Sequence, residues 1–235
     1  FRITVEAFNI AEAYQTPVII LSDQEIAQRK QTADPIDTSK LEVLSRRRPN
    51  EKELEAYSRF AFTESGVSPI SEPGMKGGNY LGAGIEHNEK GDPTASGVMH
   101  AKMNEKRFRK LQPLKQRRDL FEVLGKPDAS QALIAWGSTA GVCREAWEIA
   151  TAQGLDVKLL VPWLLYPIAE EVYAGFFEGV RSGLVVELSH QAQLYRILRM
   201  FVDVPKGVQP FARSGANPFQ PAEIAAALTR LKGAL

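Results

Sequence analysis

The spacing of apolar residues changes sharply within residues 131–154. A continuous apolar run from Ala132 to Trp136 is followed by a turn rich in small residues, and apolar positions then recur at 143, 146, 147 and 150. The short run is typical of a buried strand, and the later spacing is typical of an amphipathic helix. The pattern predicts a strand, turn and helix. Such turns present free helix N–H groups at the sheet edge where ligands bind.

The same alternation continues to the end of the chain. Further strands are expected over Val157–Val161 and Gly183–Glu187, with a helix over Ala169–Glu178 between them. Two more helices are expected from apolar residues at 194, 197, 198 and 201 and at 224, 227, 228, 231 and 235, with Pro221 in the first turn of the last helix. Strands that alternate with helices predict a parallel α/β domain, here over residues 125–235.

The first thirty residues have a different pattern. We expect a largely buried helix over Phe1–Tyr14, although a strand is also compatible with its start, and then a buried strand over Val18–Leu21. A helix over Gln24–Gln31 should follow, capped by Ser22 or Asp23. Three such elements cannot bury their own apolar faces. We therefore expect residues 1–30 to be the last unit of a domain whose earlier strands are absent, or to dock on a partner. The start at Phe1 suggests a piece of a longer polypeptide.

Residues 31–124 are predicted to connect these two parts. They begin with a polar connector to Pro49 and a short helix over Glu51–Ser58, capped by Asn50. A long loop rich in glycine and proline follows over Phe60–Gly97, and then a basic helix over His100–Gly125 with a break at Pro113. Loops of this length are usually functional or disordered. Its apolar residues favour a loop laid over another surface of this chain or of a partner.

Composition and charge narrow the possible functions. The chain has 235 residues and a net charge of +1, so it has no general attraction to nucleic acid or to acidic membranes. The basic helix is interpreted as a solvated or ion-paired face. One cysteine, Cys143, excludes an internal disulfide or a multi-cysteine cluster made by this chain alone, and it fits a reducing cytoplasm. We see no bilayer-length apolar run and expect a cytoplasmic protein.

Two groups of residues could carry chemistry. Glu86, His87 and Glu89 lie close together in the long loop, where they could bind a metal, relay a proton, or simply anchor the loop. Anchoring is favoured because metal ligands usually come from separate elements, so no metal site is predicted. No nucleophile-elbow, phosphate-loop or dinucleotide motif occurs, which argues against an independent nucleotide-dependent enzyme.

The second group lies at predicted strand ends. Ser138 and Thr139 follow the first strand of the α/β domain, and Glu187 ends the third strand. Such positions hold ligands in many α/β sheets, but they also suit helix caps. Both interpretations stay open.

Several stretches together resemble the alpha subunit of 2-oxoacid:ferredoxin oxidoreductases, especially the 2-oxoglutarate type. The similar stretches are AFNIAEAYQTPVIILSDQ at 7–24, GVSPISEPGMKGG at 66–78, GAGIEHNEKGDP at 82–93, MNEKRFRKL at 103–111, IAWGSTAGVCREA at 134–146, VVELSHQAQLYRILR at 185–199 and NPFQPAEI at 217–224. Their order and spacing cover nearly the whole chain.

The resemblance implies a fold and an activity. Residues 1–30 would end the thiamine-pyrophosphate pyrimidine-binding domain, and residues 125–235 would form a transketolase C-terminal-like three-layer α/β/α domain. Enzymes of this family decarboxylate a 2-oxoacid on thiamine pyrophosphate and Mg²⁺, pass electrons through iron–sulfur clusters to ferredoxin, and release an acyl-CoA. A beta subunit holds the diphosphate end of the cofactor, so a hetero-oligomer is implied. The activating glutamate of the family lies outside this chain, which should bind no cofactor and be inactive alone.

The sequence also departs from the family pattern. Ile70 stands where the family usually has an arginine, and Asn88 stands where members often have aspartate. Ser189 and Ala192 stand where members often have asparagine and glycine. These differences would fit a distant branch or a different 2-oxoacid. A non-catalytic subunit-interaction module and a flavodoxin-like ligand-binding domain are the two rival functions.

Overall fold

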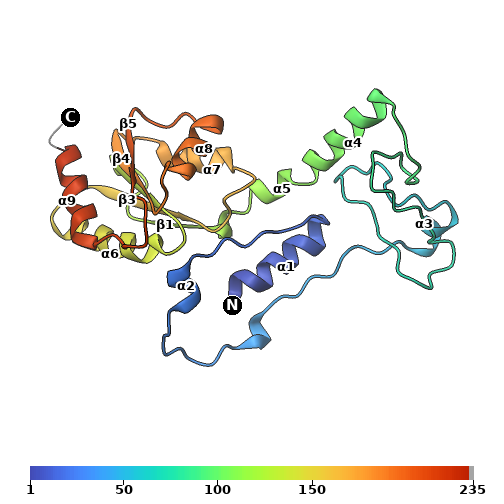
Figure 1. The fold of residues 1–235 in the computed structure, drawn as a ribbon, viewed down its shortest axis with the longest axis horizontal. Coiled ribbons are helices and arrows are strands. Elements are labelled where there is room, and N and C mark those ends of the chain that lie inside the picture. Colours follow the sequence, from blue (N-terminus) through green and yellow to red (C-terminus); the bar gives the residue numbers. More distant parts are fainter. Residues whose placement is uncertain (233–235) are drawn as a thin grey trace. The chain divides into compact units, whose positions relative to one another are not determined.

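A computed structural model describes residues 1–232 of the chain (Figure 1). These residues form two compact units. One comprises residues 1–20 and 32–113, and the other comprises residues 21–31 and 114–235. We call them the loop unit and the sheet unit and describe each by itself. None of the helices in the described residues is long and apolar enough to cross a membrane.

The sheet unit is built on a mixed five-stranded sheet. Its strands are β1 (Phe121–Leu124), β2 (Gln131–Ala135), β3 (Val157–Pro162), β4 (Ser182–Glu187) and β5 (Gly207–Ala212), in the spatial order β1-β3-β2-β4-β5. Strands β3, β2, β4 and β5 are parallel, and β1 joins the edge of β3 in the antiparallel direction. Every residue of β2, β3 and β4 is buried, as expected for parallel strands covered on both faces.

Helices cover both faces of this sheet (Figure 1). On one face, α6 (Thr139–Ala152) and α9 (Pro221–Lys232) pack on each other and on alternate strand residues, including Leu133, Leu159 and Val186. On the other lie α7 (Glu170–Phe177) and α8 (Gln193–Phe201). The sheet unit is therefore a three-layer α/β/α fold. Strands β2, β3 and β4 and the four helices of the sheet were predicted from the sequence, including the start of α9 at Pro221.

Cys143 lies at the centre of the α6 layer. The side chain is fully buried among apolar residues, and this burial raises the pKa of its thiol far above the ordinary value. Cys143 therefore packs as a small hydrophobe.

The loop unit contains little regular structure. Its helices are α1 (Arg2–Tyr14), α3 (Glu51–Glu55) and α4 (Gly97–Arg109), with a 3₁₀ turn over Thr38–Lys40. Asn50 caps α3 through a capping box with Glu53, as its position predicted. Residues 60–96 contain no helix or strand apart from one isolated bridge between His87 and Pro93. The predicted long loop is confirmed.

Polar side chains rather than a large apolar core hold the loop unit together. The buried Asn9 of α1 donates to Glu42 O at 2.9 Å and accepts from Leu44 N at 2.8 Å. At the other end of α1, Gln15 donates to Ser68 O at 2.6 Å. Helix α1 is thus joined by hydrogen bonds to both the connector and the long loop.

The structure corrects three sequence predictions. Helix α1 is not largely buried, because Phe1 and Phe8 are 60% and 69% exposed. Val18–Leu21 is not a buried strand, because no strand of the described residues pairs with it and Ile19 is 81% exposed. The predicted helix over His100–Gly125 ends at Arg109 and resumes only briefly as α5 (Gln112–Lys115), and its last part is the 3₁₀ helix Arg118–Leu120 and strand β1. Strand β5 was not predicted. Leu235, expected in the last helix, lies outside the described residues.

Helices α2 (Gln24–Gln28) and α3 begin where the sequence predicted but end earlier, at Gln28 instead of Gln31 and at Glu55 instead of Ser58. Asp23 caps helix α2, as expected. Its carboxylate accepts a hydrogen bond from Ile26 N at 3.0 Å. The compact units cut across the predicted segments 1–30, 31–124 and 125–235, since residues 21–31 and 114–124 belong to the sheet unit.

Candidate functional site

The order of the strands creates a crevice at the carboxyl edge of the sheet. The chain leaves β2 toward β3 on one side, whereas it leaves neighbouring β4 toward β5 on the other. Such a reversal is the point at which α/β sheets hold ligands. A cavity of about 560 Å³ opens here, bounded by the ends of β2 and β4, by α2 and by the segment before α9. We call it the switch-point cavity.

Residues from separate parts of the sheet unit line this cavity. They include Asp23, Gln24, Gln28, Arg29, Trp136, Gly137, Ser138, Thr139, Leu188 and Gly215. Ser138 and Thr139, predicted from the turn after β2, are therefore both at the cavity wall. Asp23 was predicted only as the cap of its own helix.

Asp23 connects two helix N-termini across the cavity wall. One carboxylate oxygen caps α2, and the other accepts the backbone N–H of Ser138, at the start of α6, at 3.1 Å. Partial burial pushes the pKa of this carboxyl up, but hydrogen bonds from Ser138, Ile26 and Glu25 outweigh that effect and lower the pKa. The positive end of the α6 dipole is thus already neutralised by a group of the chain itself.

Thr139 and Glu187 point into the structure rather than into the cavity. The Thr139 hydroxyl is buried and donates to Trp136 O at 2.6 Å, with Val186 O at 3.2 Å. Glu187 is 1% exposed, and its carboxylate accepts from Leu194 N at 2.8 Å and Tyr195 N at 3.0 Å. Of the two interpretations left open for Glu187, the geometry is that of a cap for α8.

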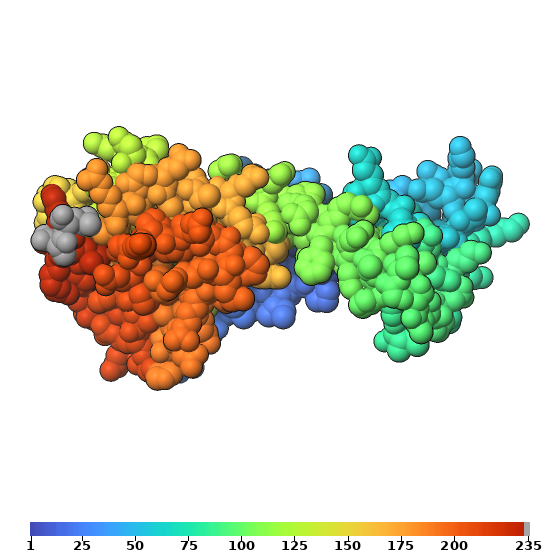
Figure 2. Space-filling view, turned by 90° about the horizontal axis from the view of Figure 1, so that it is seen from above, coloured from blue at the N-terminus to red at the C-terminus, as the bar shows by residue number. Residues whose placement is uncertain are grey.

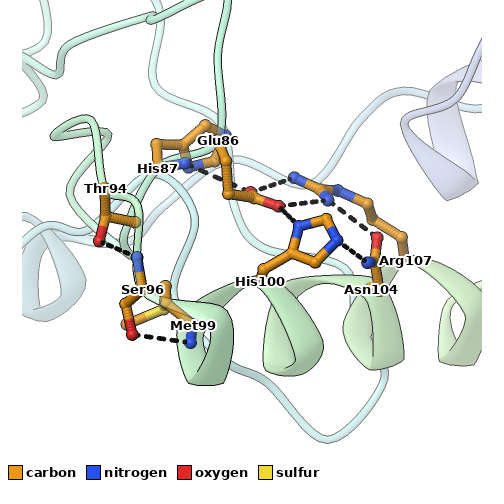
Figure 3. A network of polar contacts seen from close by, with 8 residues as sticks. All are labelled: Glu86, His87, Thr94, Ser96, Met99, His100, Asn104 and Arg107. Carbon is orange, nitrogen blue, oxygen red and sulfur yellow. Dashed lines mark hydrogen bonds and ion pairs between the residues drawn. The ribbon is translucent and has the colours of Figure 1, made fainter.

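The predicted loop cluster separates into three different environments. Glu86 reaches from the loop to α4, where it lies between His100 and Arg107 (Figure 3). His87 turns inward, is 9% exposed, and packs on the Phe60 ring at a centroid distance of 3.9 Å. Glu89 accepts from Phe62 N at 3.0 Å. The three side chains do not converge on one point.

Glu86 and three side chains of α4 form a closed hydrogen-bonded ring. Arg107 donates to Glu86 at 2.9 Å, and Nδ1 of His100 lies 2.5 Å from the other carboxylate oxygen. Asn104 Nδ2 contacts His100 Nε2 at 3.0 Å, and Asn104 Oδ1 accepts from Arg107 at 3.1 Å (Figure 3). Every donor in the ring faces an acceptor when His100 is neutral with its proton on Nδ1.

This ring strongly favours the ionised form of Glu86. The hydrogen bonds from Arg107 and His100 lower the pKa of the Glu86 carboxyl to about 2. A carboxylate held in this way is a poor proton acceptor at neutral pH. The geometry therefore favours loop anchoring for Glu86, the interpretation preferred from the sequence.

Lys106 is the buried cation of the loop unit. Its Nζ donates to Phe60 O at 2.8 Å and to Ser68 Oγ at 2.6 Å, which joins both ends of residues 60–68 to α4. Desolvation, with smaller contributions from Arg59 and Lys110, lowers its pKa to about 8. Sequence reasoning took this lysine for part of a solvated or ion-paired basic face.

The face of α4 that meets Glu86 can be recognised from one spacing in the sequence. His100, Asn104 and Arg107 recur at intervals of four and three, which places them on one face of α4. Only the tertiary structure shows that this face of α4 pairs with Glu86. Within residues 1–232, no group of three or more histidine, cysteine, aspartate or glutamate side chains is arranged to hold a metal ion.

Comparison with known proteins gives consistent matches over nearly the whole chain. Residues 1–106 match the family described as pyruvate flavodoxin/ferredoxin oxidoreductase, thiamine diP-binding. The alpha subunit of 2-oxoacid:ferredoxin oxidoreductase 2 from Aeropyrum pernix is 30% identical over 98% of this chain and 36% of its own length. The 2-oxoglutarate synthase subunit KorA from Methanothermobacter marburgensis is 26% identical over 95% of this chain and 59% of its own length.

A solved structure also matches nearly the whole chain. It is the 2-oxoglutarate:ferredoxin oxidoreductase from Magnetococcus marinus with 2-oxoglutarate, coenzyme A and succinyl-CoA bound, at 33% sequence identity and a TM-score of 0.92. The match covers 98% of this chain and 40% of that chain. The present chain thus spans little more than a third of the Aeropyrum relative and two fifths of the solved one.

Proposed function

We propose that the chain is a segment of the alpha subunit of a 2-oxoacid:ferredoxin oxidoreductase, an enzyme that oxidatively decarboxylates a 2-oxoacid and passes the electrons to ferredoxin. The observation that carries the proposal is the TM-score of 0.92 over 98% of the chain. So broad a match takes in residues 60–96, which have almost no regular structure and whose path general α/β packing does not dictate.

The substrates proposed for the whole enzyme are 2-oxoglutarate and coenzyme A, with succinyl-CoA as product. Two observations support this choice: the Magnetococcus structure holds these molecules, and the Methanothermobacter relative is named a 2-oxoglutarate synthase subunit. Ile70 keeps another 2-oxoacid open, because it stands where the family usually has an arginine and cannot supply that positive charge.

Thiamine pyrophosphate is the cofactor proposed for the complete enzyme, because residues 1–106 match a thiamine diphosphate-binding family. We propose that residues 1–30 end the domain that binds the pyrimidine part of this cofactor, and that a beta subunit holds its diphosphate end. The Mg²⁺ and the iron–sulfur cluster are proposed for the complete complex. We assign no catalytic step to a named residue of this chain.

The role that we propose for this segment is structural and substrate-facing. The sheet unit would supply the contact domain, with a beta subunit as partner. The long loop, fixed to α4 through Glu86 and Lys106, would face the substrate or that partner. His87 and Glu89 are retained as loop candidates, and Ser138 and Thr139 as cavity candidates, in this proposal.

Reconstitution of the intact enzyme tests the function. The full alpha polypeptide, produced together with its beta subunit, should reduce ferredoxin only when 2-oxoglutarate, coenzyme A and thiamine pyrophosphate with Mg²⁺ are all present. Pyruvate and 2-oxoisovalerate in place of 2-oxoglutarate test the substrate choice. A complex that assembles fully yet reduces no acceptor with any 2-oxoacid would replace this proposal with that of a non-catalytic interaction module.

One variant tests the loop within that assay. His87→Ala should lower turnover if the loop faces the substrate, and Glu64→Ala, an exposed change in the same loop, serves as its control. Undiminished turnover and unchanged assembly of the His87 variant would remove that side chain from the proposal.

A further inference from the structure

Three cations of the loop unit converge on one pair of residues. Arg59 donates to Gln15 Oε1 at 2.9 Å, and Lys110 Nζ donates to Gln15 O at 2.8 Å. The side-chain amide of Gln15 donates to Ser68 O, and Ser68 Oγ accepts from Lys106 Nζ at 2.6 Å. The three charged groups therefore lie around the contact between Gln15 and Ser68. We call Arg59, Lys106 and Lys110 the cation cluster.

The cation cluster lies where α4 meets the long loop. The green atoms of α4 and the teal atoms of the loop lie against each other in Figure 2. Lys106 belongs to α4, and Lys110 is the C-cap of the same helix four residues later, a spacing at which like charges repel. Lys106 is only 7% exposed, whereas Arg59 and Lys110 are partly exposed. Dissolved ions therefore reach the cluster at Arg59 and Lys110.

No carboxylate among residues 1–232 forms an ion pair with this cluster. All of its side-chain hydrogen bonds go to uncharged oxygen atoms. Arg46, Arg47 and Arg107 of the same unit are more exposed, and each of them is paired with a glutamate. Glu89 attracts Lys106 but lies outside ion-pair distance. The most buried positive charges of the loop unit are thus without a counter-charge, an arrangement that is costly in a folded protein.

The dipole of helix α1 does not balance this charge. Gln15 is the C-cap of α1, so its carbonyl oxygen belongs to the negative end of the helix and suits Lys110. That end is equivalent to about half an elementary charge, which is far less than three cations carry. Desolvation and the charge of Arg59 lower the pKa of Lys106 to about 8, and the same two effects lower the pKa of Lys110. The cluster therefore keeps an excess of positive charge.

We propose that the cation cluster is an oxyanion site, which binds a carboxylate or phosphate group at Arg59 and Lys110. The planar guanidinium matches two oxygen atoms of either group, and the lysine ammonium supplies a compact charge. Arg59 and Lys110 each direct one N–H toward Gln15, and their other N–H groups have no acceptor among residues 1–232. A bound oxyanion neutralises the excess charge and links the end of α1, the start of the long loop and α4. This inference does not depend on the proposed function.

Amide hydrogen exchange of the full alpha polypeptide tests the site. Inorganic phosphate is compared with sodium chloride at equal ionic strength, because both salts then screen the charges to the same degree. Amides of residues 59–68 and 104–110 should exchange roughly fivefold more slowly in phosphate, since a ligand of the ordered loop stabilises that loop. Equal exchange in the two salts would mean that nothing binds or that another part of the polypeptide already balances the charge. Either result overturns the inference.

Two further probes identify the bound group. Succinate supplies carboxylates without phosphate, and methyl phosphate supplies a phosphate ester without a carboxylate. Protection by succinate alone would assign the site to an organic acid, whereas protection by the two phosphates alone would assign it to a phosphate group. Equal slowing of exchange in strand β2 of the sheet unit would instead show a general salt effect and overturn the inference.

Charge removal tests the residues of the site. The double variant Arg59→Gln/Lys110→Gln keeps an amide donor at both positions, and it should lose the protection by phosphate. Arg109→Gln, an exposed change on α4, is the matched control and should keep that protection. Arg59→Lys preserves the charge and should retain most of the protection, whereas its loss there would attribute the effect to loop packing and overturn the inference. Protection that persists in the double variant, or disappears equally in the control, would also overturn it.

Discussion

Asp23 accepts the backbone N–H of Ser138 at 3.1 Å, although 115 residues separate them in the sequence. Because the same carboxylate caps α2, one side chain holds the segment 21–31 to the start of α6. The wall of the switch-point cavity depends on this contact.

The first prediction concerns this bond. Asp23→Ala should destabilise the attachment of residues 21–31 by about 1 kcal/mol, the usual contribution of a helix-capping side chain. Amide exchange over residues 24–29 should become roughly fivefold faster at neutral pH. Ser22→Ala leaves the carboxylate in place and is the control. Unchanged exchange in the Asp23 variant would show that other contacts hold the segment.

The second prediction concerns the pH dependence contributed by Glu86. Its folded-state pKa is about 2, below the ordinary value, so its stabilisation is complete above about pH 4.5 and is lost as the pH falls toward 2. Glu86→Gln should therefore lower the free energy of unfolding at pH 6 by roughly 1 kcal/mol, since the ion pair is partly exposed. This difference should shrink to nothing near pH 2. Urea unfolding across this range measures it, with Glu64→Gln as control.

The third prediction concerns the opposite end of the pH scale. Lys106 has a folded-state pKa of about 8, lower than in the unfolded chain, so the folded state releases the proton first. Stability of the loop unit should therefore rise between about pH 8 and pH 10.5. The neutral amine still satisfies both acceptors, Phe60 O and Ser68 Oγ. Lys106→Met should flatten this rise, whereas Lys102→Met, at an exposed position, should not. A fall in stability over the same range would contradict the assignment.

The fourth prediction concerns a buried hydroxyl. Tyr173 is fully buried, packs edge to face on Phe121, and has no hydrogen-bond partner for its hydroxyl oxygen within the described residues. An unsatisfied buried hydroxyl costs about 1–3 kcal/mol. Tyr173→Phe should consequently raise the melting temperature of the sheet unit, whereas Tyr166→Phe, at an exposed ring, should leave it unchanged. A lower melting temperature would reveal a partner for the Tyr173 hydroxyl.

The fifth prediction concerns Ala192, at the start of α8. It adopts a left-handed conformation with φ of 50° and is 7% exposed. This conformation costs roughly 1–2 kcal/mol for a residue with a Cβ atom, which is consistent with the glycine expected here from the family pattern. Ala192→Gly should be neutral or mildly stabilising in thermal unfolding. Ala192→Val should be clearly destabilising, and a stable valine variant would argue against the strain.

Much of the sheet unit could be predicted because its buried strands are continuous apolar runs. Strand β5 was missed because Pro210 interrupts its sequence, and edge strands tolerate proline. Strand β1 was missed because Phe121–Leu124 directly follows a basic helical stretch and only Phe121 of its residues is buried. Both errors occur at the edges of the sheet, where the hydrophobic pattern is weakest.

The positions of the candidate site residues could be predicted from the sequence, but their hydrogen-bond partners could not. The turn holding Ser138 and the loop holding Glu86 were both found from local composition. Asp23 lies 115 residues from its partner Ser138, and Arg107 lies 21 residues from its partner Glu86. Both contacts form only in the folded chain. Local sequence patterns contain no direct information about such pairs.

The uncovered run Val18–Leu21 has a consequence for handling the polypeptide. Four consecutive β-forming, uncharged residues with Ile19 81% exposed make a template for cross-β stacking between molecules. Pro17 and Asp23 flank the run as gatekeepers, since proline cannot extend a ladder and repeated carboxylates repel one another. The isolated 235-residue chain should form fibrils faster when Pro17 or Asp23 is replaced by valine.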